Sequence, residues 1–160
     1  LLAQDDARKI LIVDLDVHQG DGTAVLLAGR EDVFTLSIHN ERNFPTRKAR
    51  SSRDIALPDG IEDDAYLAIL DEALHEILPG FEPDLLLYQA GVDPHVDDRL
   101  GRLALTDAGL ERRERMVIRR ARDRGIAVAS ALGGGYGHDH RAVALRHARS
   151  MIAMADEASR

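Results

Sequence analysis

Three side chains of types that bind metal ions lie two residues apart near the start of the sequence. Asp14, Asp16 and His18 follow an apolar run at residues 10–13. Side chains two apart on an extended strand share one face, so these groups can converge where the strand opens into a loop. Imidazole and carboxylate ligands suit zinc or another divalent first-row metal, and a catalytic site typically has three protein ligands. Asp93, which ends a later apolar run, can complete such a set with Asp16 and His18.

The same spacing also fits a purely structural role. Asp14 and Asp16 can cap the turn and the helix that follows, which leaves His18 as a surface residue. The pattern D-x-D-x-H leaves both interpretations open, and other residues must decide between them.

The elements that must position these side chains alternate between strands and helices. Apolar runs rich in branched residues predict buried strands at residues 9–17, 32–39, 84–93 and 125–135. The spacing of apolar residues predicts helices at residues 21–28, 63–78, 106–124 and 141–156, and Pro79 is expected to end the second. Residues 40–60 are expected to form a polar loop. The alternation predicts an α/β fold with right-handed crossovers, in which helices sandwich a parallel sheet and residues 9–17 form a central strand.

Chemically distinctive residues gather at the carboxyl ends of all four predicted strands. In open α/β sheets, these ends are where ligands bind. The residues are Asp14, Asp16 and His18 after the first strand, Ser37 and His39 after the second, Asp93 after the third, and residues 133–136 after the fourth. The sequence therefore predicts one functional rim built from four strand ends.

Composition narrows the class of protein. With 160 residues and 44% hydrophobic content, the sequence suffices for one globular domain with a core. The formal net charge of -7 disfavours nonspecific binding to nucleic acid or to an anionic membrane. The sequence has no cysteine, so a metal site must use histidine and carboxylate ligands. No apolar run is long enough to span a bilayer and no signal peptide is recognisable, so we expect a cytoplasmic protein.

An apolar strand that ends in D-x-D, with Gly22-Thr23 nearby, resembles the start of the haloacid-dehalogenase phosphatases. That resemblance implies a nucleophilic Asp14 and an acid/base Asp16 beside a magnesium ion. The later sequence does not support it. The family needs a lysine after the nucleophile strand and an acidic pair at a later strand end, whereas only Lys9 and Lys48 are present and the acidic pairs fall in a predicted helix or loop.

Four stretches taken together resemble the zinc-dependent histone deacetylase family. They are VDLDVHQGDGT, TLSIH, YQAGVDPHVDDRLGRLALT and LGGGY, in this order between Val13 and Tyr136. The forms AGVD, DRLG and LGGGY are more similar to class IV-type and bacterial members than to the larger class I enzymes. The resemblance implies an arginase/deacetylase-like fold, with residues 1–160 as the carboxyl-terminal portion of a single catalytic domain.

The resemblance also implies how the site works. Asp16, His18 and Asp93 match the zinc ligands, and Tyr136 matches the tyrosine whose hydroxyl polarises the scissile amide. The implied reaction is hydrolysis of an N-acetyl or longer N-acyl amide of a lysine or a polyamine. Glycines at 133–135 predict a tight turn that brings the ring of Tyr136 to the metal, although such a run alone also fits a phosphate-binding loop or a simple turn.

Two further features of the family have matches in this sequence. Asp14, Ser37 and the backbone carbonyl of Ile38, together with those of residues 16 and 18, match a potassium site. Asp14 and Asp21 match carboxylates that orient two adjacent histidines, the general base and acid, on a loop before the first strand. Residues 1–8 contain no histidine. We therefore expect the amino-terminal part of the domain to be missing and the chain alone to be weakly active or inactive.

The missing histidine pair keeps a noncatalytic alternative open. In that alternative the chain is a remnant that binds a metal or a partner but belongs to no working enzyme. Both interpretations predict zinc binding. The expected partners are an acetylated lysine or polyamine substrate and either the missing amino-terminal half or a second copy of the chain.

Arginines crowd the predicted helix at residues 106–124, at positions 112, 113, 115, 119, 120 and 122. Acidic residues, including Glu111 and Glu114, are interspersed with them, so we interpret this helix as having a solvated charged face rather than a nucleic-acid site. His138 and His140 are expected to begin the last helix as solvated residues rather than to act as a general base.

Overall fold

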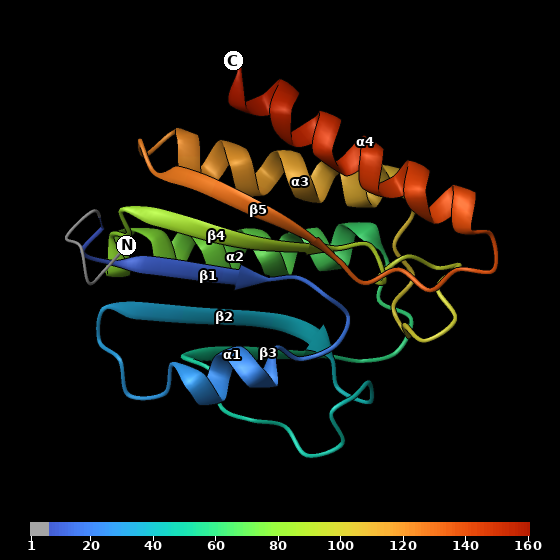
Figure 1. Cartoon of the computed structure of the whole chain (residues 1–160), viewed down its shortest axis with the longest axis horizontal. Helices are drawn as coiled ribbons and strands as arrows, with labels where there is room; N and C mark the ends of the chain where they lie inside the picture. The colour runs from blue at the N-terminus through green and yellow to red at the C-terminus, as the bar shows by residue number, and fades with distance from the viewer. Residues whose placement is uncertain (1–6) are drawn as a thin grey trace.

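The structure, a computed structural model, describes residues 7–160 and forms one parallel sheet with helices around it (Figure 1). The strands are β1 (Ile10–Asp14), β2 (Val33–Asn40), β3 (Arg53–Leu57), β4 (Leu85–Gly91) and β5 (Ala127–Gly133), in the spatial order β3-β2-β1-β4-β5. The helices are α1 (Asp21–Leu26), α2 (Asp63–Phe81), α3 (Asp107–Arg122) and α4 (His140–Ala158). The predicted parallel α/β architecture, with the first strand at its centre, is confirmed.

Along β1 and the residues after it, apolar side chains that face the core alternate with partly buried side chains on the other face. Leu11, Val13, Leu15 and Val17 are fully buried and belong to the hydrophobic core. The side chains between them, which include Asp14 and Asp16, are only partly buried. Because successive side chains of an extended chain point to opposite faces, the polar residues lie on the face away from the core.

The helices cover the two faces of the sheet unequally. α2 and α3 lie on one face and α1 lies against the other, while α4 packs on α3 (Figure 1). α2 buries Tyr66, Leu70 and Leu74 in the core, whereas α1 has six residues and buries only Ala24. Among the described helices, none has both the length and the apolar character that crossing a bilayer requires.

Two predictions about the elements are wrong. Residues 40–60 contain β3, which pairs in parallel with β2. Only Ile55 and Leu57 of this edge strand pack on the core, and two apolar residues in a polar stretch are too few to predict a strand. α2 continues past Pro79 to Phe81. A proline in the last turn removes a single backbone hydrogen bond, and the amide of Glu82 still donates to the carbonyl of Leu78 at 3.0 Å.

The interpretation of α3 as a solvated arginine helix is wrong for two of its residues. Arg112 and Arg119 are exposed, but the side chains of Arg113 and Glu114 are fully buried. The physical reason is their position on the helix. Arg113 and Glu114 lie about one turn after the buried Leu110 and about one turn before the buried Val117, so they share the face that α3 packs into the protein.

Candidate metal centre

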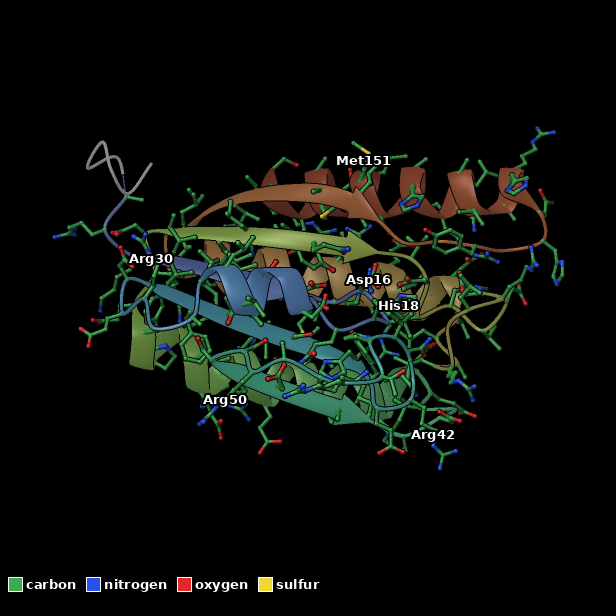
Figure 2. The ribbon with its side chains drawn as sticks, turned by 60° about the horizontal axis from the view of Figure 1, so that its bottom comes forward. Asp16, His18, Arg30, Arg42, Arg50 and Met151 are labelled. Atoms are coloured by element: carbon green, nitrogen blue, oxygen red, sulfur yellow. The ribbon has the colours of Figure 1, made fainter. Side chains whose placement is uncertain are left out.

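Asp16, His18 and Asp93 meet at the carboxyl ends of β1 and β4. These two strands are neighbours in the parallel sheet, so the segments that follow them begin side by side. One ligand atom of each residue lies within 4.8 Å of the ligand atoms of the other two. Figure 2 shows the side chains of Asp16 and His18 close together beyond the strand ends. The structure therefore brings together the three residues predicted to bind a metal.

Side-chain carboxylates interrupt the β1 ladder and turn the chain at this point. The amide of Asp16 donates to Asp14 Oδ1 at 3.1 Å, and the amide of His18 donates to Asp16 Oδ1 at 2.9 Å. The amide of Val17 donates to Asp93 Oδ1, also at 2.9 Å. These amides no longer bond to a neighbouring strand, which is why β1 ends at Asp14 rather than at the predicted residue 17.

Hydrogen bonds inside the cluster determine where its protons reside. Nδ1 of His18 lies 2.9 Å from Asp16 Oδ1 and 3.2 Å from Asp93 Oδ2. These two hydrogen bonds raise the pKa of His18 to about 10. Burial raises the pKa of Asp93 to about 6, whereas for Asp16 the hydrogen bonds with His18 outweigh burial and lower the pKa. The two carboxylates thus hold a positive charge between them, and the same donor set fits a divalent cation of the zinc type.

Close packing fixes the carboxylates of the cluster. Nε2 of Gln89 donates to Asp16 Oδ2 at 3.0 Å, and Oε1 of Gln89 accepts from the amide of Gly91 at 2.6 Å. A Cβ atom at Gly91 would lie 2.7 Å from Asp16 Oδ2, and one at Gly134 would lie 2.4 Å from Asp93 Cγ. Both glycines therefore allow the backbone to approach the two carboxylates of the cluster.

Asp14 and Asp21, the predicted partners of a histidine pair, occupy different environments. Asp14 is partly buried at the end of β1, and burial raises the pKa of its carboxyl to about 7. Asp21 is the first residue of α1, and its Oδ1 accepts a hydrogen bond from the amide of Gly22 at 2.9 Å. Asp14 therefore lies just before Asp16 and His18 in the chain, and Asp21 lies just after them.

The residues predicted to bind potassium come from β1 and β2. Ser37 is the register partner of Asp14 in the parallel ladder, and Ile38 follows it in β2. Oγ of Ser37 is buried and lies 3.0 Å from Nδ1 of His39. The potassium site remains a prediction.

Tyr136 lies on the loop that follows β5, and its side chain is 55% exposed. Its backbone amide donates to Asp98 Oδ2 at 2.6 Å. The preceding glycines, Gly134 and Gly135, have φ angles of 59° and 104°, a backbone region that glycine adopts without strain. The approach of the Tyr136 ring to a metal ion stays a prediction. Within residues 7–160, no hydrogen bond holds the phenol ring of Tyr136 in place.

Two residues beside the cluster were missed by the sequence analysis. Gln89 orients Asp16, and its signal was available: it is a polar residue inside the otherwise apolar strand LLLYQAG. Nδ2 of Asn43 lies 3.5 Å from Nε2 of His18, and it donates a hydrogen bond to the carbonyl of Leu100 at 2.6 Å. Asn43 belongs to a loop between β2 and β3, where residue spacing predicts no contact.

Comparison with known proteins places this arrangement in context. The family model described as the histone deacetylase domain matches residues 1–152. The chain is 52% identical over 141 residues to an uncharacterized protein of Picosynechococcus sp. The aligned residues cover 88% of this chain and 47% of that protein. It is 35% identical over 131 residues to histone deacetylase 2 of Arabidopsis thaliana, covering 80% of this chain and 34% of that protein. The chain thus spans less than half the length of these relatives.

Solved structures agree with the observed architecture. The crystal structure of an HDAC homolog complexed with SAHA matches with a TM-score of 0.80 and 28% identity, over 99% of this chain and 44% of that one. Acetylpolyamine aminohydrolase from Burkholderia pseudomallei matches with a TM-score of 0.80 over 94% of this chain and 46% of that one; at 24% identity this likeness shows the fold alone. The expectation of an arginase/deacetylase-like fold is confirmed.

Proposed function

The chain belongs to the histone deacetylase family, and from this premise we propose that it supplies the metal-binding part of a zinc-dependent amide hydrolase site. The proposed substrate is an N-acetyl or N-acyl amide of a lysine or a polyamine. The observation that carries the proposal is the convergence of Asp16, His18 and Asp93 at adjoining strand ends.

Each residue of the proposed site has a separate chemical role. Asp16, His18 and Asp93 would hold a zinc ion, which when bound would supply Lewis-acid chemistry for an amide carbonyl and would lower the pKa of water to about 7. The hydroxyl of Tyr136 donates a hydrogen bond to the oxygen that becomes negative during amide cleavage, an interaction typically worth about 3 kcal/mol. Asp14, Ser37 and the backbone carbonyls of residues 16, 18 and 38 are proposed to hold a potassium ion.

The general acid and base of the reaction are proposed to come from polypeptide outside these 160 residues. The seven histidines of the sequence include no adjacent pair. Asp14 and Asp21 are proposed to orient two histidines supplied by the amino-terminal part of the domain. General acid/base catalysis contributes typically about 10² to 10⁴-fold, so the 160 residues alone are expected to hydrolyse amides very slowly.

Zinc binding is the first test, because it depends on these 160 residues alone. The chain is expected to bind one equivalent of zinc, and Asp93→Ala is expected to abolish binding because it removes a buried ligand. Asp123→Ala, which removes a carboxylate at the C-cap of α3, is the matched control and should bind zinc normally. Unchanged zinc occupancy in Asp93→Ala contradicts the metal assignment.

Complementation is the second test, because it separates an enzyme from a noncatalytic remnant. The amino-terminal part of the Picosynechococcus relative, added as a separate polypeptide, should restore hydrolysis of an acetyl-lysine peptide or an acetylated polyamine. Tyr136→Phe should then lower the restored rate by about 10² to 10³-fold, since one oxyanion donor is lost. Zinc binding without any restored hydrolysis favours the noncatalytic alternative.

A further inference from the structure

A buried ion pair lies beneath the proposed metal centre, on the side of the sheet that α3 covers. The side chains of Arg113 and Glu114 both have zero exposure. Burial opposes the charge of Arg113, but the neighbouring Glu114 carboxylate raises the pKa of the guanidinium above its usual value. The protein therefore keeps a permanent positive charge inside its core.

The guanidinium of Arg113 links two segments that are far apart in sequence. Nη1 donates to the carbonyl of Leu15 at 3.1 Å, and Nη2 donates to the carbonyl of Gly91 at 2.9 Å. Nη2 also donates to Glu114 Oε1 at 2.7 Å. One side chain thus forms a fork between β1, β4 and its own helix.

Glu114 is itself held in place from two sides. The hydroxyl of Tyr88, on β4, donates to Glu114 Oε2. The hydroxyl of Ser150, on α4, donates to Glu114 Oε1 at 3.0 Å. Since both carboxylate oxygens have partners, the direction of the Arg113 fork is fixed by the surrounding elements.

The two carbonyls that Arg113 binds belong to the segments that carry the metal ligands. Leu15 lies between Asp14 and Asp16, and Gly91 lies two residues before Asp93. The last backbone hydrogen bond between the two strands runs from the amide of Leu15 to the carbonyl of Gln89 at 3.2 Å. Arg113 therefore joins the strands at the point where their ladder ends and the ligand loops begin.

We propose that Arg113 is a positioning residue that sets the separation of the Asp16–His18 segment from Asp93 and so prepares the site for its metal ion. This inference rests on the proposed function in one respect, namely that these three residues bind zinc. Stability alone does not explain the ion pair, because apolar residues of similar volume often stabilise a protein core as well or better. A guanidinium that binds one carbonyl from each ligand-bearing segment instead fixes the distance between those two segments.

The test compares zinc affinity with folding stability in the 160-residue chain. Arg113→Lys keeps the positive charge beside Glu114 but lacks the planar fork that reaches both carbonyls. Its zinc dissociation constant, measured by competition with a chromogenic chelator, is expected to rise about 10 to 100-fold, as for other residues that orient metal ligands. Val117→Ala, a core truncation one turn further along α3, controls for general destabilisation and should leave zinc affinity unchanged.

The outcomes separate this inference from the proposed function. If the unaltered chain binds no zinc, the proposed function fails. If it binds zinc and Arg113→Lys folds and binds equally well, or if Val117→Ala weakens zinc binding by as much, only the role of Arg113 is overturned. Should Arg113→Lys not fold, Tyr88→Phe makes the same test, because it frees one oxygen of Glu114 while keeping the guanidinium. Weakened zinc affinity in that variant supports the role, and unchanged affinity overturns it.

Discussion

β1 and β5 belong to the same parallel sheet, but the residues beyond their carboxyl ends are held in contrasting ways. Past β1, the chain is held by three hydrogen bonds: Gln89 of β4 donates to Asp16, the amide of Val17 donates to Asp93 in the segment after β4, and Arg113 of α3 donates to the carbonyl of Leu15. β5 is an edge strand whose residues are mostly exposed, with Leu132 at 52%. The loop after it carries Tyr136, which is the most exposed of the proposed site residues.

The contrast separates two properties of the proposed site. Contacts among the described residues orient the proposed metal ligands, so we expect metal binding to be a property of this chain alone. The backbone of the Tyr136 loop is anchored by Asp98, but within residues 7–160 no hydrogen bond orients its phenol ring. Substrate polarisation by Tyr136 should therefore depend on surroundings that the metal ligands do not need.

Gly134 lies where the β5 loop approaches Asp93, and Gly134→Ala should have the largest effect. An alanine at its φ of 59° costs about 1 to 3 kcal/mol in backbone strain. Its Cβ would also overlap the carboxyl of Asp93, and such overpacking typically costs about 1 to 3 kcal/mol more. Urea unfolding should show the summed loss of stability, and a zinc titration should show weakened binding because Asp93 is displaced.

Gly125→Ala is the matched control for that variant. Gly125 has a φ of 68°, but its added Cβ meets nothing within 4 Å. The control should lose only the part that comes from backbone strain and should bind zinc like the unaltered chain. Equal zinc affinity in the two variants would show that the β5 loop does not press on the metal centre.

Sequence patterns predicted the parts of this molecule that depend on short-range periodicity. The branched apolar run before Asp14 identified the central strand, and the spacing of Asp14, Asp16 and His18 predicted that they share a face. Asp93 required only the further rule that parallel strands end at a common edge. Family membership then decided against the phosphatase interpretation of the same residues.

Other features depend on contacts that no local pattern encodes. Arg113 is buried with its guanidinium bound to the carbonyl of Leu15, a partner 98 residues away in sequence that no local pattern predicts. Its place on the apolar face of α3, in contrast, can be predicted from residue spacing. β3 was not predicted because its strand conformation depends on hydrogen-bonded pairing with β2 and not on a pattern in its own five residues. The exposure of Tyr136 reflects the edge position of β5, which depends on the order of the strands in the sheet.

A smaller effect should come from His39, a buried histidine at the end of β2. Burial, reinforced by the charge of Lys48, lowers the pKa of His39 below its ordinary value of 6.5. As the pH falls below 6.5, the unfolded chain takes up a proton that the folded chain resists, so this residue lowers the free energy of unfolding. His39→Gln should therefore lose less stability than the unaltered chain between pH 7 and about pH 5.

The comparison with the unaltered chain isolates His39 from other titrating groups, such as Asp14 and His95. Parallel profiles for His39→Gln and the unaltered chain would contradict the assignment.

The smallest effect is expected for Tyr136→Phe in the isolated chain, where the loss of an exposed hydroxyl should change the free energy of unfolding by at most about 0.5 kcal/mol and leave zinc affinity unaltered. Tyr88→Phe makes the same chemical change at a buried hydroxyl that donates to Glu114, and should cost about 1 to 3 kcal/mol. Urea unfolding and zinc titration of both variants measure the contrast directly. If Tyr136→Phe weakens zinc binding or folding as much as Tyr88→Phe does, the Tyr136 ring is already held in the isolated chain. The two regions would then be equally organised, and the dependence of Tyr136 on added polypeptide would have to be abandoned.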